Sequence, residues 1–184
     1  MGYNLSKLRV LIVDDSKNMR MLVKTVLNAL GVQIVRESSD GTAALTELRS
    51  GPIDIAIVDW VMEPMDGLEF VRQVRTAEDS PNPFLPIIMM TGHTERHRIF
   101  KARDTGVTEF LAKPITAKTL LLRMTNIIEH PRPFVRAKGY FGPDRRRRNE
   151  DYQGPERRGQ AKPAEGAATP AAAAPTTEAK PVQA

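Results

Sequence analysis

From Arg9 to about His130, short apolar runs alternate with longer stretches in which apolar residues recur every three or four positions. The short runs predict strands at residues 9–13, 34–37, 53–58, 87–90 and 109–112. The longer stretches predict helices at residues 17–30, 41–50, 67–75, 95–104 and 116–129. Because the strands are apolar along their whole length, helices must cover both faces of the sheet. The pattern therefore predicts a doubly wound α/β domain with a five-stranded parallel sheet.

The periodicity stops after residue 130. Pro131 and Pro133 end the last predicted helix, and residues 131–160 are rich in arginine, glycine and proline. Residues 161–184 consist mainly of alanine, proline, threonine, glutamate and lysine, so we expect them to form a disordered tail. The 184-residue chain thus divides into a leader at 1–7, the α/β domain at 8–130, the arginine-rich segment at 131–160 and the tail.

Charge and composition limit the class of protein. Residues 1–130 contain equal numbers of basic and acidic residues, so the net charge of +5 lies entirely in residues 131–184. This asymmetry indicates a second function after the α/β domain. The chain has no cysteine, which excludes disulfides and thiolate metal sites. The N-terminus has no apolar signal region and no run is long enough to span a bilayer, so we expect a cytoplasmic protein without membrane insertion.

Polar residues follow four of the predicted strands at their carboxyl ends. Asp14 and Asp15 follow the first strand, Asp59 the third, Thr91 the fourth and Lys113 the fifth. In an open parallel sheet, ligands bind outside the carboxyl ends of the strands. Clustered carboxylates need a cation to stay ionised together, and hard oxygen ligands suit Mg²⁺. The pattern therefore predicts a site for Mg²⁺ and a phosphoryl group, in which the lysine and the threonine contact the phosphoryl oxygens.

These motifs resemble the receiver domain of bacterial two-component response regulators, the CheY-like fold. The resemblance covers residues 8–130, about two thirds of the chain, and implies the flavodoxin-like strand order 2-1-3-4-5. It is carried by Val13-Asp14-Asp15-Ser16, Val58-Asp59-Trp60, Pro64-Met65-Asp66-Gly67, Met90-Thr91-Gly92 and Lys113-Pro114.

The resemblance implies a role for each residue of the site. Asp59 would accept a phosphoryl group from a histidine kinase, a phosphotransfer protein or a small acyl phosphate. The protein would then be no enzyme, but a phosphoacceptor with at most slow self-dephosphorylation. Asp15, Asp59 and the backbone carbonyl of Val61 would bind Mg²⁺ directly, and Asp14 would act mostly through water. Thr91 and Phe110 would report the phosphorylated state as switch residues, and Pro114 would allow a cis peptide that re-aims Lys113.

Residues 131–184 have no helix-turn-helix pattern and too little apolar content for a core, so we expect no effector domain there. We expect the output to come from protein contacts, from the arginine-rich segment, or from both. The predicted fourth helix, with the fifth strand and fifth helix, offers a basic face for an acidic partner or for solvent. Its basic residues are Arg96, Arg98, Lys101 and Arg103.

The arginine-rich segment contains a repeat of twelve-residue period. Residues 140–146, Tyr-Phe-Gly-Pro-Asp-Arg-Arg, return at 152–158 as Tyr-Gln-Gly-Pro-Glu-Arg-Arg. Guanidinium groups beside aromatic rings suit phosphates and stacked bases, so nucleic acid, an acidic protein surface and a cyclic dinucleotide are competing ligands. The segment resembles the tail of CheY-like cyclic-di-GMP effectors, single receivers that act on the flagellar motor. That resemblance implies nucleotide binding by Arg145, Arg146, Arg147, Arg148, Tyr152, Arg157 and Arg158.

The motifs fit two other classes of protein less well. A haloacid-dehalogenase-like phosphatase would need an Asp-x-Asp motif after the first strand, where this chain has Asp14-Asp15-Ser16. A DNA-binding regulator would need its contacts in residues 139–158, because no helix-turn-helix pattern follows the receiver. We therefore expect a single-domain response regulator with chemotaxis-type output, and nucleic acid is the weaker candidate partner.

Overall fold

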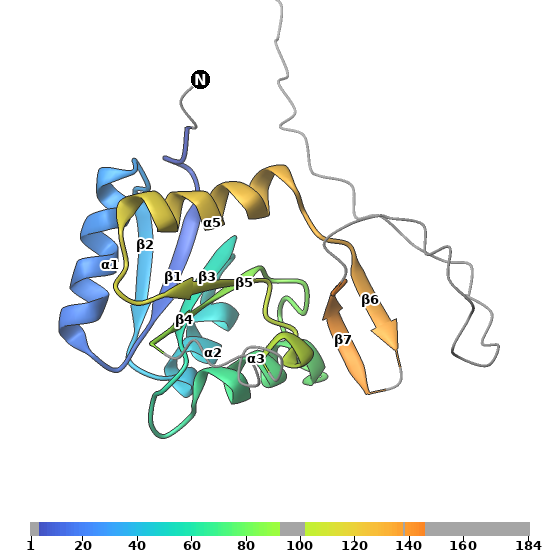
Figure 1. The fold of residues 1–184 in the computed structure, drawn as a ribbon. Helices are drawn as coiled ribbons and strands as arrows, with labels where there is room; N and C mark the ends of the chain where they lie inside the picture. The colour runs from blue at the N-terminus through green and yellow to red at the C-terminus, as the bar shows by residue number, and fades with distance from the viewer. Residues whose placement is uncertain (1–3, 93–101, 138, 146–184) are drawn as a thin grey trace, which may run out of the picture. The chain divides into compact units, whose positions relative to one another are not determined.

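The sheet has the strand order predicted from the sequence. A computed structural model describes residues 4–92, 102–137 and 139–145. Five parallel strands pair in the order β2-β1-β3-β4-β5 (Figure 1). They are β1 (Arg9–Val13), β2 (Ile34–Ser38), β3 (Ile55–Asp59), β4 (Ile87–Thr91) and β5 (Glu109–Ala112).

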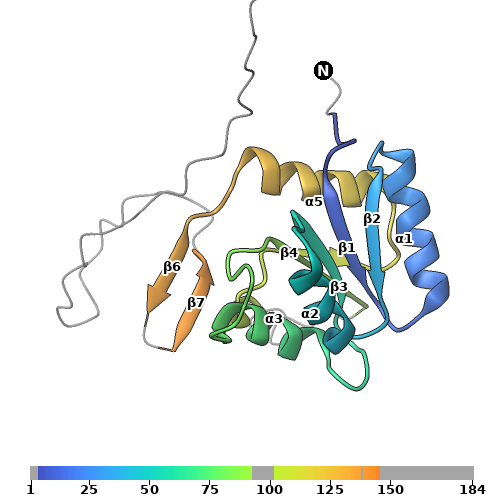
Figure 2. The same cartoon turned by 180° about the vertical axis from the view of Figure 1, so that it is seen from behind.

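Helices cover both faces of this sheet, as Figures 1 and 2 show from opposite sides. Alternate residues of β1 face different layers, since successive side chains of a strand point to opposite faces. Val10 and Ile12 belong to one core cluster, and Leu11 and Val13 belong to the other. The helices are α1 (Lys17–Ala29), α2 (Gly41–Ser50), α3 (Gly67–Thr76) and α5 (Ala117–Glu129).

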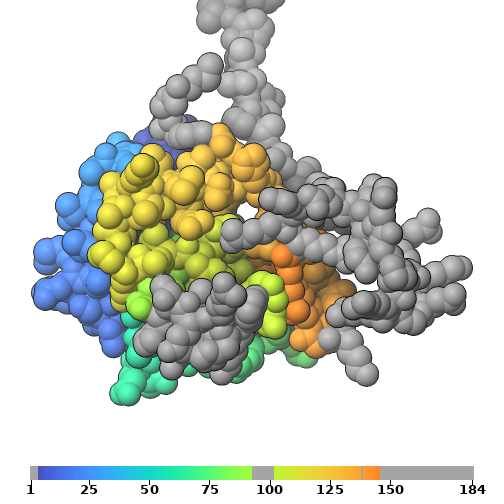
Figure 3. Space-filling model, viewed as in Figure 1, coloured from blue at the N-terminus to red at the C-terminus, as the bar shows by residue number. Residues whose placement is uncertain are grey.

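The two core clusters show which helices share a face. The cluster with Val10 and Ile12 includes Val23 and Leu27 of α1 and Leu120 of α5. The cluster with Leu11 and Val13 includes residues of α2 and α3, namely Ala44, Leu48, Phe70, Val71 and Val74. The sheet is therefore the middle of three layers. The helices α1 and α5 cover one face, and α2 and α3 cover the other. Figure 3 shows α5, in yellow, at the surface of the domain.

Most predicted elements are observed, with small differences at their ends. The third strand begins at Ile55, two residues later than predicted, because Asp54 bonds to Arg9. Of the predicted fourth helix, residues 102–105 are helical and 93–101 lie outside the described residues. In the described part of the chain, no helix has the length and apolar content needed to cross a membrane.

A β-hairpin that the hydrophobic pattern did not indicate follows α5. Its strands, β6 (Phe134–Ala137) and β7 (Tyr140–Pro143), pair antiparallel, and Gly139 in the turn has φ +76°. The hairpin contacts α3, and Phe134 and Phe141 pack with Phe84 at ring-centroid distances of 5.2 and 5.3 Å. The first copy of the repeat therefore begins as a folded strand.

The hairpin covers a buried arginine of α3. Arg75 is 4% exposed, and its guanidinium donates to the carbonyls of Pro83, Leu85 and Gly106. The ring of Phe134 lies 5.1 Å from the guanidinium carbon. Burial lowers the pKa of Arg75 to about 10. Three carbonyl acceptors thus solvate a cation that the hairpin shields from water.

Candidate functional site

The carboxyl ends of the central strands lie level with one another. In the sheet, Val13 pairs with Val58 and Asp59 pairs with Met90. This register brings the residues that follow β1 beside the last residue of β3. Carboxylate oxygens of Asp14, Asp15 and Asp59 all lie within 4.8 Å of one another. The cluster predicted from strand ends is thus an acidic pocket.

Asp14 is the most deeply buried member of the cluster. Its side chain is 1% exposed, and its Oδ1 accepts a hydrogen bond of 2.8 Å from the Ser16 amide. Burial raises the pKa of Asp14, and the Asp59 carboxylate raises it further against the opposing effects of Ser16 and Lys113. Its Oδ2 has no hydrogen bond among the described residues, and Lys113 Nζ lies 3.5 Å away. A buried carboxylate oxygen in this position is one that a hard cation would satisfy.

The three carboxylates therefore fit Mg²⁺. Asp15 is exposed, whereas Asp59 is 7% exposed, so the pocket has a wet side and a buried side. Mg²⁺ commonly keeps several waters and is bound through one or two carboxylates. One exposed and one buried carboxylate therefore suit a cation that keeps part of its water shell.

Lys113 brings a positive charge to the same pocket. Its Nζ lies 2.9 Å from Asp59 Oδ1, and its amide donates to the Thr91 carbonyl at 2.9 Å. The Lys113–Pro114 peptide bond is cis. Since the ammonium contacts Asp59 directly, it stands within reach of any group attached to that carboxylate.

The remaining predicted site residues occupy different environments around the pocket. Thr91, the last residue of β4, is 4% exposed. Phe110, on β5, is half-buried and packs against the core cluster on the α2 and α3 side. The Val61 side chain, two residues after Asp59, is 58% exposed. The structure therefore brings Thr91 to the pocket edge, while the roles of Phe110 and Val61 stay predictions.

Gly67 supports the pocket from the main chain. A β-carbon at Gly67 would overlap the carbonyl oxygen of Asp59. The Gly67 amide donates to the Trp60 carbonyl at 3.0 Å, and the Trp60 amide donates to the Met90 carbonyl at 3.1 Å. A glycine is required here because two backbone segments meet at close range. The preceding Glu63–Pro64 bond is also cis, which the sequence analysis did not anticipate.

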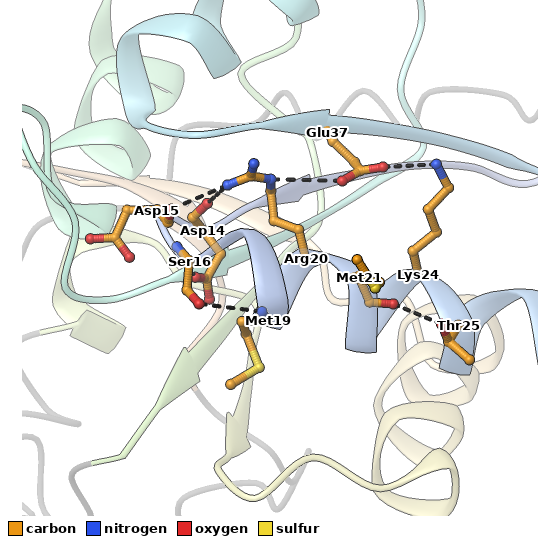
Figure 4. A network of polar contacts seen from close by, with 9 residues as sticks. All are labelled: Asp14, Asp15, Ser16, Met19, Arg20, Met21, Lys24, Thr25 and Glu37. Atoms are coloured by element: carbon orange, nitrogen blue, oxygen red, sulfur yellow. Dashed lines mark hydrogen bonds and ion pairs between the residues drawn. The ribbon is translucent and has the colours of Figure 1, made fainter.

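One residue that the sequence analysis did not select lies behind the acidic pair. Arg20, on α1, donates to the main-chain carbonyls of Asp14 and Asp15 and forms an ion pair with Glu37 (Figure 4). Arg20 lies one turn into the first helix, on the side of β2, and this position was the only signal of its role. Hydrogen bonds to main-chain carbonyls have no sequence motif, so the pattern alone could not indicate it.

The arginine-rich segment is described only up to Arg145. Arg145 Nη1 lies 3.3 Å from Asp104 Oδ1, and its guanidinium carbon lies 4.0 Å from the centre of the Tyr140 ring. Of the proposed nucleotide-binding residues, Arg146, Arg147, Arg148, Tyr152, Arg157 and Arg158 lie outside the described residues. So do Arg96, Arg98 and Lys101 of the basic face, while Arg103 is partly exposed beside Asp104.

Comparison with known proteins agrees with this geometry. The model of the response regulator receiver domain family matches residues 10–125. The chemotaxis protein CheY-3 of Vibrio cholerae is 36% identical over 122 residues, which cover 66% of this chain and 92% of the relative. The chemotaxis protein CheY of Pseudomonas aeruginosa is 38% identical over 122 residues, which cover 66% of this chain and 97% of the relative.

A solved structure shows the same fold. The chemotaxis response regulator CheY4 of Vibrio cholerae superimposes with a TM-score of 0.60 and 34% sequence identity. The match covers 65% of this chain and 98% of that structure. The hairpin β6–β7 lies after the last residue that the family model matches.

Proposed function

Because the chain belongs to the response regulator receiver domain family, we propose that it is a response regulator phosphorylated on Asp59. The observation that carries this proposal is the 2.9 Å contact between Lys113 Nζ and Asp59 Oδ1 inside the acidic pocket. The phosphoryl donor is a histidine kinase, a phosphotransfer protein or a small acyl phosphate. The protein is a phosphoacceptor rather than an enzyme that turns over a substrate.

The transfer uses one oxygen of Asp59 as the nucleophile. This oxygen attacks phosphorus, the bond from phosphorus to the donor oxygen or nitrogen breaks, and an aspartyl phosphate forms. With acetyl phosphate as donor, acetate leaves with the electrons of the broken bond. Lys113 then balances the negative charge on the new phosphoryl oxygens, because its ammonium already contacts Asp59.

Mg²⁺ belongs to this proposal as the bound cofactor. The residues that would hold it are Asp14, Asp15 and Asp59, whose carboxylate oxygens lie together, with the carbonyl of Val61 as the resemblance implies. When bound, the cation neutralises charge on the acidic pocket and on the transferred phosphoryl group. The buried Oδ2 of Asp14 supports the proposal, since it accepts no hydrogen bond from the described residues and has only the Lys113 ammonium, at 3.5 Å, to offset its charge.

We assign the output to protein contact, of the kind that chemotaxis regulators use. Two of the relatives described above are chemotaxis proteins of similar length to the receiver. Thr91 and Phe110 lie at the end of β4 and on β5, so a shift at the pocket can reach the surface formed by β5 and α5. A flagellar motor component is the proposed type of target.

The arginine-rich segment is proposed to bind cyclic-di-GMP as a second input. Its support is the sequence repeat and the excess positive charge of residues 131–184. Arg145 pairs with Asp104 and lies over the Tyr140 ring, so a ligand would have to compete with these contacts. Ligand contacts would therefore come mainly from residues after 145. Nucleic acid or an acidic protein is the alternative ligand of the same segment.

The phosphorylation site is tested by mass spectrometry of the full chain after treatment with acetyl phosphate and Mg²⁺. The wild type should gain one phosphoryl group, and Asp59→Asn should gain none. Asp54→Asn is a matched control, because Asp54 lies at the opposite end of the same strand and pairs with Arg9. Phosphorylation of Asp59→Asn at the wild-type level would refute the assignment.

Cyclic-di-GMP binding is tested by isothermal titration of the full chain and of a chain ending at Arg145. This truncation keeps the hairpin and removes the second copy of the repeat. The proposal expects heat of binding in the full chain only. Equal heat in both chains, or none in either, contradicts it, and a mobility shift with DNA instead of dinucleotide would favour the alternative.

A further inference from the structure

The main chain of the acidic pair is attached to α1 through Arg20. Arg20 Nη1 donates to the Asp14 carbonyl at 2.7 Å and to the Asp15 carbonyl at 3.3 Å. In Figure 4 the Asp15 carboxylate points away from this guanidinium. Because the guanidinium engages main-chain oxygens, it holds the turn after β1 without a hydrogen bond to Asp14 Oδ2.

Arg20 is itself held in place from β2. Its Nε lies 3.7 Å from Glu37 Oε2, and Glu37 Oε1 lies 2.8 Å from Lys24 Nζ. The Arg20 side chain is 17% exposed, compared with 45% for Lys24. Glu37 pairs in register with Ile12 of β1, so its backbone is fixed by the sheet. The three side chains therefore form a brace between α1 and β2, directly behind the acidic pair.

We propose that Arg20 is a positioning residue for the divalent-cation site, which acts by fixing the backbone of Asp14 and Asp15. This inference rests on the proposed function in one respect, the binding of Mg²⁺ by the acidic pocket. Three neighbouring carboxylates repel one another, so an unsupported turn would let Asp14 and Asp15 separate from Asp59. Partners that orient metal ligands typically contribute about 10- to 100-fold to metal affinity.

A guanidinium suits this role better than an ammonium. Its planar fork has five donors, so it bonds two carbonyls and faces a carboxylate at the same time. A lysine at position 20 would keep the charge and lose that geometry. The substitution therefore separates positioning from simple electrostatics. If Arg20 acted as a charge alone, its removal would strengthen binding of a cation, and Arg20→Lys would leave binding unchanged.

The test is a Mg²⁺ titration of the full unphosphorylated chain. Trp60, the single tryptophan, follows Asp59 and is mostly buried, so its fluorescence is the binding signal. The Mg²⁺-dependent rise in melting temperature is measured in parallel. We expect both Arg20→Ala and Arg20→Lys to weaken Mg²⁺ binding about tenfold or more. Glu37→Gln should weaken Mg²⁺ binding less than the Arg20 substitutions do. Combined with Arg20→Ala, it should cause no further loss of Mg²⁺ binding.

Two controls distinguish positioning from charge and from loss of fold. Lys17→Ala removes one positive charge from an exposed position on the same helix and should not weaken Mg²⁺ binding. Urea unfolding without Mg²⁺ establishes that each variant is folded. With acetyl phosphate, the slower phosphorylation of Arg20→Ala should recover at saturating Mg²⁺, because the defect lies in cation affinity.

The outcomes separate this inference from the proposed function. Unchanged or tighter Mg²⁺ binding by Arg20→Ala, beside normal binding by the wild type, overturns the positioning role alone. Absence of Mg²⁺ binding by the wild type, in both fluorescence and melting, overturns the cation site and the positioning role together. Weakened binding by Arg20→Ala that is absent in Arg20→Lys also contradicts the inference, since the planar fork of the guanidinium would then not be needed.

Discussion

Gly67 approaches the backbone of Asp59 so closely that a β-carbon on Gly67 would overlap the Asp59 carbonyl oxygen. The contact joins the start of α3 to the end of β3, where the proposed phosphoacceptor lies. A side chain at position 67 must displace one of these two backbone segments. The first prediction concerns this close approach.

Gly67→Ala should lower the free energy of unfolding by about 2 kcal/mol, as is usual for overpacking at a backbone contact. It should also slow phosphorylation by acetyl phosphate, because the displaced segment carries Asp59. Gly92→Ala is the matched control: a β-carbon on Gly92, next to Thr91, would meet no atom of the described residues within 4 Å. Urea denaturation measures both variants, and equal stability of the two would contradict the prediction.

Asp14→Asn should raise the stability of the Mg²⁺-free chain. Burial raises the folded-state pKa of Asp14 above its unfolded value, so ionisation of this carboxyl favours the unfolded chain. The gain in stability should be complete at a pH above the pKa of Asp14 in the folded chain. It should vanish as the pH falls below the ordinary carboxyl pKa of about 3.9. Urea unfolding in EDTA over this range of pH measures it, and added Mg²⁺ should reduce or reverse the gain.

Asp40→Asn should change the free energy of unfolding in the opposite direction to Asp14→Asn. Asp40 caps α2, and the hydrogen bond from the Ala43 amide, with smaller help from Ser39 and Thr42, lowers its pKa. Its stabilisation is therefore present above the unfolded pKa and is lost as the pH falls through the folded pKa. If Asp40→Asn instead raised the free energy of unfolding at neutral pH, the effects of these two substitutions on stability would not follow the folded-state pKa of each carboxyl.

Arg75→Ala should destabilise the fold by about 3 kcal/mol, because it leaves three buried carbonyls without a donor. These carbonyls belong to Pro83, Leu85 and Gly106. Arg72→Ala, one turn earlier on α3, should change stability by about 0.5 kcal/mol or less, since Arg72 is 55% exposed and pairs only with Glu69 among the described residues. Thermal or urea unfolding compares them, and similar losses would rule out a special role for the buried arginine.

Removal of the hairpin should expose Arg75 and uncover the side of the Phe84 ring that packs on Phe134 and Phe141. A chain ending at His130 should therefore lose about 2 kcal/mol relative to the full chain, the contribution of burying the two hairpin phenylalanines. A chain ending at Arg145 should keep full stability, because Phe134 and Phe141 remain in place. Differential scanning calorimetry measures both, and equal melting temperatures would show that the hairpin adds no stability.

The predicted site residues came from the ends of apolar runs, and this signal was reliable because parallel strands share one carboxyl edge. The carboxylates of Asp14, Asp15 and Asp59 therefore meet as expected, although the acidic pair and Asp59 are far apart in the chain. The helix α2 also has the predicted bounds, Gly41–Ser50, because Asp40 caps its first turn. Periodicity and capping are local properties, so a single sequence contains them.

The hairpin and the Arg20 brace were not predictable in the same way. The strands β6 and β7 are four residues each, and β7 contains a glycine and a proline, so neither strand shows a clear alternation. Their burial depends on Phe84 and Arg75, which lie about fifty residues earlier in the chain. The repeat indicated a ligand-binding element, whereas the structure uses residues 140–143 of its first copy as a strand.

The sequence by itself determined the α/β class, the strand order implied by the receiver resemblance, and the set of carboxylates at the strand ends. The class and the carboxylates at the strand ends follow from hydrophobic periodicity, which any chain of this pattern must satisfy to bury its strands, whereas the strand order is what the resemblance implies. Only the tertiary structure decided that Arg20 braces the acidic pair and that residues 134–143 shield Arg75. Both depend on donors that meet main-chain carbonyls, and a carbonyl is present at every residue, so its partner is chosen by the fold.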